Sequence, residues 1–366
     1  MSITKDDLVL FLQSLKQEYV LKNLTNYGEQ ILYTLEYIHY QDVLNHIKKR
    51  QDSLAIESPN NFLAFYIPKN KTIDDIAYGC RCCLANKITH IRHSDKCNSN
   101  CNFCYFYMQS DDSRVLPYWA YRESSTRFNL DEDEMKLLLY KQIFNKVNAI
   151  GWLEKEPLMK MEKMKPIMKF ISDNGIYQYL YTNGILANKD NLLMLKDWGL
   201  NEIRFNLQAS DFSPAVLAYI RLAGTIIENV CIETPIYSKS FENFLKHKDY
   251  ILDSGIKQIN MPELQINPNN IKVFESEGQV YRHRRGYVSP VSSRHYVYDL
   301  IELAIKESWD CIINDCSNDT KFFRGVYNTH NSDINSGIMY ETSFKYLPIQ
   351  YYLDIVNQYV DVELEF

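Results

Sequence analysis

Residues 88–107 read ITHIRHSDKCNSNCNFCYFY, and this stretch determines how the rest of the chain is interpreted. Cys97, Cys101 and Cys104 follow a strand-like segment at 88–93 with the spacing C-x3-C-x2-C, and aromatic residues come directly after them. Three thiolates on one short loop can bind three irons of a cubane 4Fe–4S cluster and leave the fourth iron without a protein ligand. Because an open iron can bind a small molecule, the loop indicates catalysis rather than simple electron storage.

The cysteine loop resembles the signature of the radical S-adenosylmethionine (radical SAM) superfamily, including the aromatic Phe103 before the third cysteine. The resemblance implies that Cys97, Cys101 and Cys104 bind a 4Fe–4S cluster and that SAM binds its open iron. It also implies reductive cleavage of SAM to a 5′-deoxyadenosyl radical, which takes a hydrogen atom from a substrate. A structural zinc site is the alternative, but it normally needs four ligands, and no Cys or His closely follows Cys104.

The composition is typical of a soluble globular enzyme, with 366 residues and a mean hydropathy of −0.35. No apolar run reaches the roughly 18 residues that span a bilayer, and residues 1–7 lack the layout of a signal peptide. Nine cysteines without an export signal favour metal or redox chemistry in a reducing compartment. We therefore expect a cytoplasmic protein.

The net charge of −6 disfavours nucleic acid as a partner, because such binding relies on clustered Lys and Arg. One basic run, RHRR at 282–285, fits either a site for a small anion or a solvated face. The expected partners are therefore a small-molecule or peptide substrate and, from the resemblance, an electron donor such as flavodoxin or ferredoxin.

Strand-like and helix-like segments alternate from residue 86 onwards, after a mostly helical N-terminal extension at 1–85. The expected strands are 88–93, 147–153, 177–182, 201–207, 229–235, 257–263 and 309–314. The expected helices are 131–146, 160–174, 188–198, 212–223, 241–254 and 294–307. This rhythm predicts an α/β fold in which 86–315 form a partial (β/α)6 barrel, as in the radical SAM core, followed by a C-terminal extension at 316–366. The cysteine loop then lies where barrel enzymes place active sites.

The ends of the second and third strands resemble family motifs that hold SAM. Glu154-Lys155-Glu156-Pro157 stands where the family usually has Gly-Gly-Glu-Pro, so the resemblance implies that Glu156 or Glu154 binds the SAM ammonium. The two missing glycines change how closely the backbone can approach. Thr182-Asn183-Gly184 resembles the T-N-G motif, which implies that Thr182 and Asn183 face the cofactor or substrate. Ordinary turns are the alternative at both places.

Polar residues at 202, 204, 206 and 208 alternate along the fourth strand and so share one side, which in a small barrel is the lumen. There Arg204 can meet the SAM carboxylate and Asn206 a ribose hydroxyl. Glu233 and Glu263 end the next two strands. They can bind a cationic or hydroxylated substrate or SAM, or they can form structural ion pairs with Arg204 or with an arginine of the basic run.

Five further cysteines flank the core at 80, 82, 83, 311 and 316. Several radical SAM branches hold an additional metal through such residues. The resemblance therefore leaves open an auxiliary iron–sulfur cluster or another metal on Cys80, Cys83 and Cys316. Cys231 lies in an apolar strand and is expected in the core.

Together these features predict a radical SAM enzyme whose radical modifies an amino-acid-like metabolite or a peptide, as in natural-product pathways. A radical SAM enzyme that modifies transfer RNA is the alternative within the class. A non-catalytic zinc-binding interaction protein is the alternative outside it. The residues do not identify the substrate.

Overall fold

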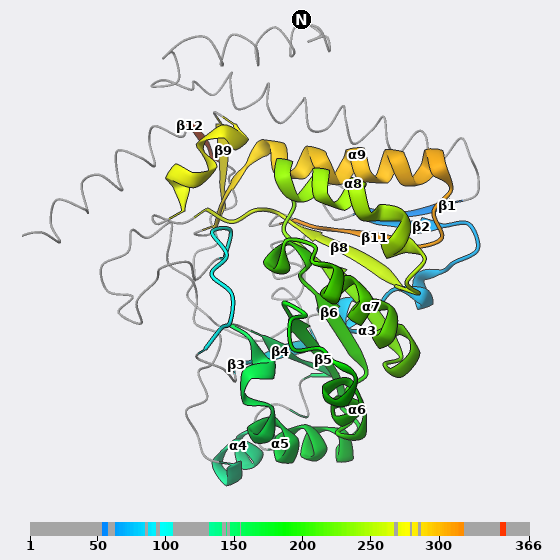
Figure 1. Ribbon diagram of the computed structural model, residues 1–366, viewed down its shortest axis with the longest axis vertical. Coiled ribbons are helices and arrows are strands. Elements are labelled where there is room, and N and C mark those ends of the chain that lie inside the picture. Colours follow the sequence, from blue (N-terminus) through cyan, green and yellow to red (C-terminus); the bar gives the residue numbers. More distant parts are fainter. Residues whose placement is uncertain are drawn as a thin grey trace, which may run out of the picture.

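A computed structural model of the chain describes residues 53–57, 63–84, 87–92, 96–104, 132–140, 144, 147–153, 155–266, 270–278, 280–284, 287–317 and 345–348 (Figure 1). Its main element is one nine-stranded sheet. In spatial order the strands are β1 (Ser53–Glu57), β2 (Leu63–Pro68), β11 (Ile312–Cys316), β8 (Gln258–Pro262), β7 (Asn229–Glu233), β6 (Glu202–Phe205), β5 (Tyr177–Thr182), β4 (Ala149–Leu153) and β3 (Ile88–Arg92).

The strands β3 to β8 lie in chain order, and each is parallel to the next. β11 continues the parallel sheet beyond β8, whereas β2 and β1 add to it in antiparallel fashion. The six parallel strands and their helices form the partial (β/α)6 barrel that the sequence predicts, so this prediction is confirmed. The sheet stays open, because β1 and β3 form its two edges.

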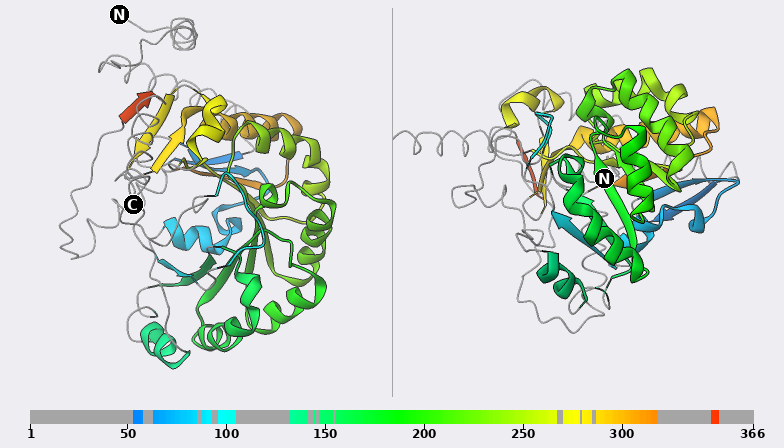
Figure 2. Two further views of the ribbon diagram at one scale, coloured as in Figure 1. Left: turned by 60° about the vertical axis from the view of Figure 1, so that its left-hand side comes forward. Right: turned by 60° about the horizontal axis from the view of Figure 1, so that its bottom comes forward.

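Helices cover the outer face of the curved sheet (Figure 2). They are α4 (Glu132–Leu138), α5 (Met161–Asp173), α6 (Lys189–Asp197), α7 (Pro214–Ile226), α8 (Ser238–Leu252) and α9 (Val291–Glu307). In α5, Met164, Ile167, Met168 and Ile171 are buried, and their spacing of three and four residues places them on one helix face. None of the helices in the described part of the chain is long and apolar enough to cross a membrane.

Short elements complete the fold. The 3-10 helices are η2 (Ile73–Asp75), η6 (Pro157–Lys160), η7 (Leu207–Ser210) and η8 (Ile271–Glu277). A second, three-stranded sheet contains β10 (Tyr287–Pro290), β9 (Val280–Arg284) and β12 (Lys345–Pro348) in that order. Through β12, part of the expected C-terminal extension pairs with β9.

The segment before the barrel differs from the expected helical extension where the structure describes it. Residues 53–68 form the strands β1 and β2, and only 78–84 form an α-helix, α3 (Tyr78–Leu84). Phe65 and Ile67 in β2 are fully buried, because this strand lies between β1 and β11. The helical spacing that led to the prediction lies in residues 1–50, outside the described residues.

The helix α3 lies on the concave side of the sheet, inside the partial barrel, as the left view of Figure 2 shows in light blue. It packs against β3, β4 and β5. A Cβ atom at Gly79 would lie 2.8 Å from Arg204 Nη2 and 3.1 Å from Tyr179 Cδ1, so a residue without a side chain is needed at this contact. A helix and polar side chains of the strands therefore line the lumen.

Candidate active site

The three cysteines of the loop lie beyond the C-terminal end of β3, at the end of the barrel where active sites of such folds are found. All three are free, and Cys97 is exposed, whereas Cys101 and Cys104 are half-buried. The backbone N–H of Cys104 donates to the carbonyl of Cys101 at 3.0 Å, which closes the loop around its second and third cysteines.

The side chain of Asn183 holds the loop from the end of β5. Its Nδ2 donates to Asn98 Oδ1 at 2.7 Å and to Ser99 Oγ at 3.3 Å, and it lies 3.9 Å from Cys97 Sγ. Its Oδ1 accepts from the backbone N–H of Ile185. The T-N-G motif therefore fixes the cysteine loop directly.

The η7 segment holds the loop from the other side. The carbonyl of Ala209 accepts from Ser99 Oγ at 3.3 Å and from Cys101 Sγ at 3.8 Å. Asn206, which was expected to meet a ribose hydroxyl, accepts a hydrogen bond from the backbone N–H of Ala209 at 3.3 Å. The contact of Asn206 with SAM stays a prediction, while its observed role is to shape η7. No sequence motif predicted that a backbone carbonyl at this position contacts the cysteine loop.

The electrostatics of the three thiols fit a metal cluster. Burial, with smaller contributions from Cys104 and Cys97, raises the pKa of Cys101 to about 12. Three thiolates together therefore need positive charge between them, which iron provides when it binds and deprotonates them. No three His, Cys, Asp or Glu side chains of the described residues converge on a single ion. Because each cysteine of a cubane cluster binds a different iron, the loop needs no such convergence.

The carboxylate of Glu156 is fully buried and links the ends of β4 and β5. Its Oε1 accepts from the Leu158 N–H at 3.1 Å and from Thr182 Oγ1 at 2.8 Å, and its Oε2 accepts from the Asn183 N–H at 2.8 Å. The Glu156 N–H donates to the carbonyl of Lys96, next to the first cysteine, at 2.9 Å. These contacts make Glu156 a positioning residue for the cysteine loop, and its contact with SAM stays a prediction. Glu154 lies outside the described residues.

Burial raises the pKa of Glu156 from its ordinary 4.5 to about 7. Between these two pH values the unfolded chain is ionised at this residue, whereas the folded chain keeps the proton. Stability should therefore fall as the pH rises from about 4.5 to about 7, by on the order of 3 kcal/mol. Denaturant titrations across this pH range should show that the free energy of unfolding of Glu156→Gln no longer falls as the pH rises. The control is Glu162→Gln at an exposed position of α5, which should keep the pH dependence of the wild-type protein. An unchanged pH dependence in Glu156→Gln would contradict the prediction.

Gly184 ends the T-N-G motif in a left-handed conformation with φ +79°. A Cβ atom there would lie 2.6 Å from Val216 Cγ1 and 2.9 Å from Phe205 Cδ1. Gly184→Ala should lower the free energy of unfolding by about 2–4 kcal/mol, because backbone strain and overpacking add. Gly175 has a similar φ of +70° with open space around it, so Gly175→Ala should cost only about 1 kcal/mol. If thermal unfolding shows equal losses of stability in the two variants, the predicted clash of a Cβ atom at position 184 with Val216 and Phe205 is wrong.

Arg204 lies in the lumen, almost completely buried, and pairs with two carboxylates. Its Nε lies 2.5 Å from Glu202 Oε1, and its Nη1 lies 3.3 Å from Glu233 Oε2 and donates to Tyr181 Oη at 3.0 Å. The guanidinium also stacks over the Tyr179 ring at 4.4 Å. The ion pair with Glu233 is one of the two roles expected for that carboxylate, and the contacts of Arg204 and Glu233 with SAM stay predictions.

Phe103 is buried and faces Tyr237, with ring centroids 6.1 Å apart. Tyr237 in turn meets the ring of Phe274 edge-on at 5.3 Å. The aromatic residue of the cysteine motif thus belongs to an apolar wall beside the loop. Its contact with the cofactor stays a prediction.

The second metal site expected on Cys80, Cys83 and Cys316 stays a prediction. Cys80 is buried in the lumen, and its sulfur is surrounded by polar groups of the protein at 3.2–3.8 Å. These groups are Arg204 Nη2, Gln258 Nε2, Asn260 Oδ1 and Asn314 Nδ2. The Cys80 sulfur is therefore surrounded by hydrogen-bonding groups of the protein itself. Cys231 is fully buried in β7, as expected.

The polar lumen residues of β8 and β11 were missed in the sequence. Gln258 and Asn260 alternate along β8, and Asn314 occupies the corresponding position of β11. This is the same period-two pattern that identified the polar positions of the fourth strand. Applied to the later strands, it would have found these residues too.

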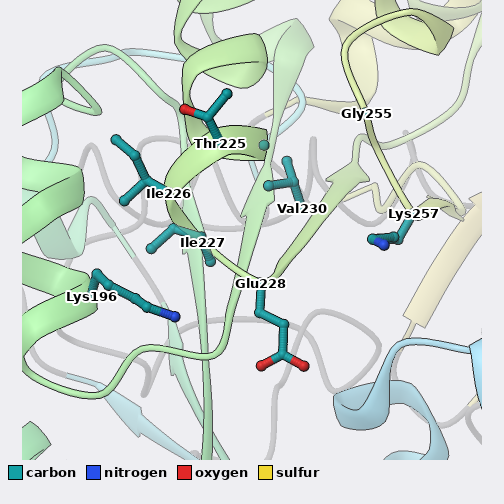
Figure 3. A pocket seen from close by; sticks show the side chains of 9 residues that line it. Lys196, Thr225, Ile226, Ile227, Glu228, Val230, Gly255 and Lys257 are labelled. Atoms are coloured by element: carbon teal, nitrogen blue, oxygen red, sulfur yellow. The ribbon is translucent and has the colours of Figure 1, made fainter.

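A hollow of about 420 Å³ opens at the other end of the barrel (Figure 3). Its lining includes Lys196, Glu228 and Lys257, from segments that precede β7 and β8 or end α6. Because the strands are parallel, this hollow lies away from the cysteine loop. It is not part of the candidate site.

Comparison with known proteins agrees with the geometry. Residues 91–261 match the family model of the Radical SAM superfamily. A putative glycyl-radical enzyme activating enzyme of Methanocaldococcus jannaschii is 23% identical over 222 residues, which cover 58% of this chain and 56% of the relative. An uncharacterized protein of the same organism is 26% identical over 151 residues, or 38% of this chain and 44% of the relative. The chain thus spans about half the length of these relatives.

Among solved structures, Streptococcus suis SuiB bound to its precursor peptide SuiA is similar to this chain with a TM-score of 0.42 and 11% identity. The similarity covers 85% of this chain and 66% of SuiB. The family match begins within β3 and ends within β8, so it includes the cysteine loop and all six parallel strands of the partial barrel. A match to this family implies a 4Fe–4S cluster and SAM as cofactors, and residues 91–261 of this chain are a domain similar to those of the radical SAM superfamily.

Proposed function

We propose that the chain is a radical SAM enzyme that acts on an amino-acid unit, either in a small metabolite or in a peptide. The observation that carries the proposal is the loop of three free cysteines at the C-terminal end of a parallel sheet, inside the region that matches the family. When bound, the cluster and SAM supply an electron and an adenosyl radical that takes a hydrogen atom from the substrate.

The residues around the loop orient the cluster ligands. Asn183 and the carbonyl of Ala209 hold the loop between β5 and η7, and the Ser99 N–H lies 3.5 Å from Cys97 Sγ. N–H groups directed at the sulfurs of a cluster stabilise its reduced form and so tune its potential. The loop is therefore built both to place the cluster and to adjust its redox chemistry.

Apolar side chains lie beside the site. Phe103 and Tyr237 form an apolar wall, and the Glu156 carboxylate at the ends of β4 and β5 is completely buried. A radical that takes hydrogen from carbon must be kept from other reactions, and a closed, apolar surrounding favours this.

A relative with a named role supports an amino-acid or peptide substrate. The similar Methanocaldococcus protein is described as a putative activating enzyme for a glycyl-radical enzyme, so its expected target is a polypeptide. Cys97 is exposed, and we propose that a small one-electron donor protein, such as flavodoxin or ferredoxin, reduces the cluster from this side of the loop. Both partners are part of the proposal.

SAM cleavage tests the proposal without a known substrate. Anaerobically reconstituted protein, reduced with dithionite and incubated with SAM, should form 5′-deoxyadenosine and methionine in equal amounts, measured by mass spectrometry. Cys104→Ala should form neither product. A wild-type protein that holds a reduced cluster and leaves SAM intact would contradict the proposal.

A further inference from the structure

Three polar side chains form a row across neighbouring strands inside the barrel. Glu233 on β7 is in register with Asn260 on β8, which is in register with Asn314 on β11. Asn260 and Asn314 contact Cys80 of α3, and Glu233 contacts Arg204, so all three face the lumen. We call Glu233, Asn260 and Asn314 the polar rung.

Each member of the polar rung has one hydrogen-bonding atom that no other described residue satisfies. Asn260 Oδ1 accepts from Gln258 and Asn314, but Asn260 Nδ2 has no partner. Asn314 Nδ2 donates a hydrogen bond to Asn260 Oδ1, but Asn314 Oδ1 accepts none from the described residues. Exchanging the amide oxygen and nitrogen of Asn260 would only place its N–H groups against the N–H donors of Gln258 and Asn314. Because Asn260 and Asn314 are 0% and 1% exposed, these unmet bonds are costly and indicate a missing partner.

The charges of the lumen point the same way. Two carboxylates, Glu202 and Glu233, lie against the single guanidinium of Arg204. Burial lowers the pKa of Arg204, but Cys80 and the neighbouring carboxylates raise it by more, so the guanidinium stays charged. Only Oε2 of Glu233 is engaged by a described residue, and the side chain keeps 13% exposure. This half-buried carboxylate therefore keeps one oxygen that can accept from a second cation.

The polar rung therefore offers an acceptor at Glu233, a donor at Asn260 and an acceptor at Asn314. The free amino end of a peptide presents the complementary order, namely an ammonium, a carbonyl oxygen and an amide N–H. We propose that the polar rung binds the free amino end of a peptide or of an amino-acid amide, with its ammonium on Glu233. This inference rests on the proposed function and names the substrate class for the same site.

A binding experiment tests the role of the ammonium. A pool of tripeptide amides with varied side chains is incubated with reconstituted protein and SAM, and bound peptides are identified by affinity selection and mass spectrometry. The same pool with acetylated amino ends is measured in parallel. Peptides with free amino ends should be retained, and acetylation should weaken their binding by about thirtyfold or more, as expected for a lost charge-assisted contact. Equal retention of both pools, or retention of neither, would overturn the proposal.

Variants then locate the contact. Glu233→Gln should weaken the binding of peptides with free amino ends to the level of the acetylated peptides, whereas Glu228→Gln should not change their binding. Glu228 lines the hollow at the opposite end of the barrel and is the matched control. If Glu233→Gln instead weakens the binding of SAM, the polar rung binds the amino-acid end of SAM and the proposal is wrong. The acetylated pool tests the same contact on wild-type protein, so the test stands even if the variant does not fold.

The two proposals can fail separately. SAM cleavage without peptide reports only on the proposed function. Peptide retention reports only on the polar rung, because it needs no turnover. If the protein cleaves SAM but retains free and acetylated peptides equally, the proposed enzyme class stands and the proposed substrate class is wrong.

Discussion

Cys101→Ala is expected to abolish the binding of iron and the cleavage of SAM. Wild-type protein reconstituted under anaerobic conditions should hold about four iron atoms per chain and show the brown charge-transfer absorption of a cubane cluster. The variant lacks one of the three thiolates and should lose both the absorption and nearly all iron. Iron and sulfide analysis with absorption spectroscopy measures the effect.

Cys311→Ala is the matched control. Cys311 is also a free cysteine, but it is buried in the apolar core between the sheet and its outer helices. This variant should keep the full iron content and absorption. If Cys101→Ala kept its iron while Cys311→Ala lost it, the assignment of the cluster loop would be wrong. An iron content near eight in wild-type protein would indicate an auxiliary cluster in addition.

Arg204→Met should lower the free energy of unfolding by about 3–5 kcal/mol, because it leaves the buried carboxylates of Glu202 and Glu233 without their cation. Methionine keeps most of the side-chain length, so the loss reports on charge and hydrogen bonds more than on volume. Urea titration followed by circular dichroism measures it.

Arg221→Met provides the comparison on the surface. Arg221 is exposed and lies 4.2 Å from the centre of the Tyr250 ring. Removing this exposed cation–π contact should cost about 0.5–1 kcal/mol. Losses of similar size in both variants would show that the lumen ion pairs contribute little and that water reaches them.

The spacing of Cys97, Cys101 and Cys104 and the alternation of strands and helices were sufficient to predict the barrel and the place of the loop. Both signals are local, since they depend on residues a few positions apart. The alternating polar residues around Arg204 likewise predicted a polar lumen, because strand periodicity alone decides which side chains share a face.

What escaped prediction depends on contacts between distant segments. The sequence around Glu156 suggested a ligand for SAM, but its oxygens are engaged by Leu158, Thr182 and Asn183, two of which belong to the end of another strand. The position of α3 inside the barrel depends on Gly79 fitting against Arg204, which no local pattern encodes. The strand β2 escaped because it pairs with β11, more than 240 residues away.

We propose that this loop holds a cluster whose open iron binds SAM. Electron–nuclear double resonance of the reduced protein, with SAM labelled by 17O in its carboxylate or 15N in its amino group, measures this contact. We predict a hyperfine coupling of both labels to the cluster, present in wild-type protein and in Cys311→Ala. A cluster whose signal shows no coupling to either label, under conditions in which SAM is bound, would contradict it.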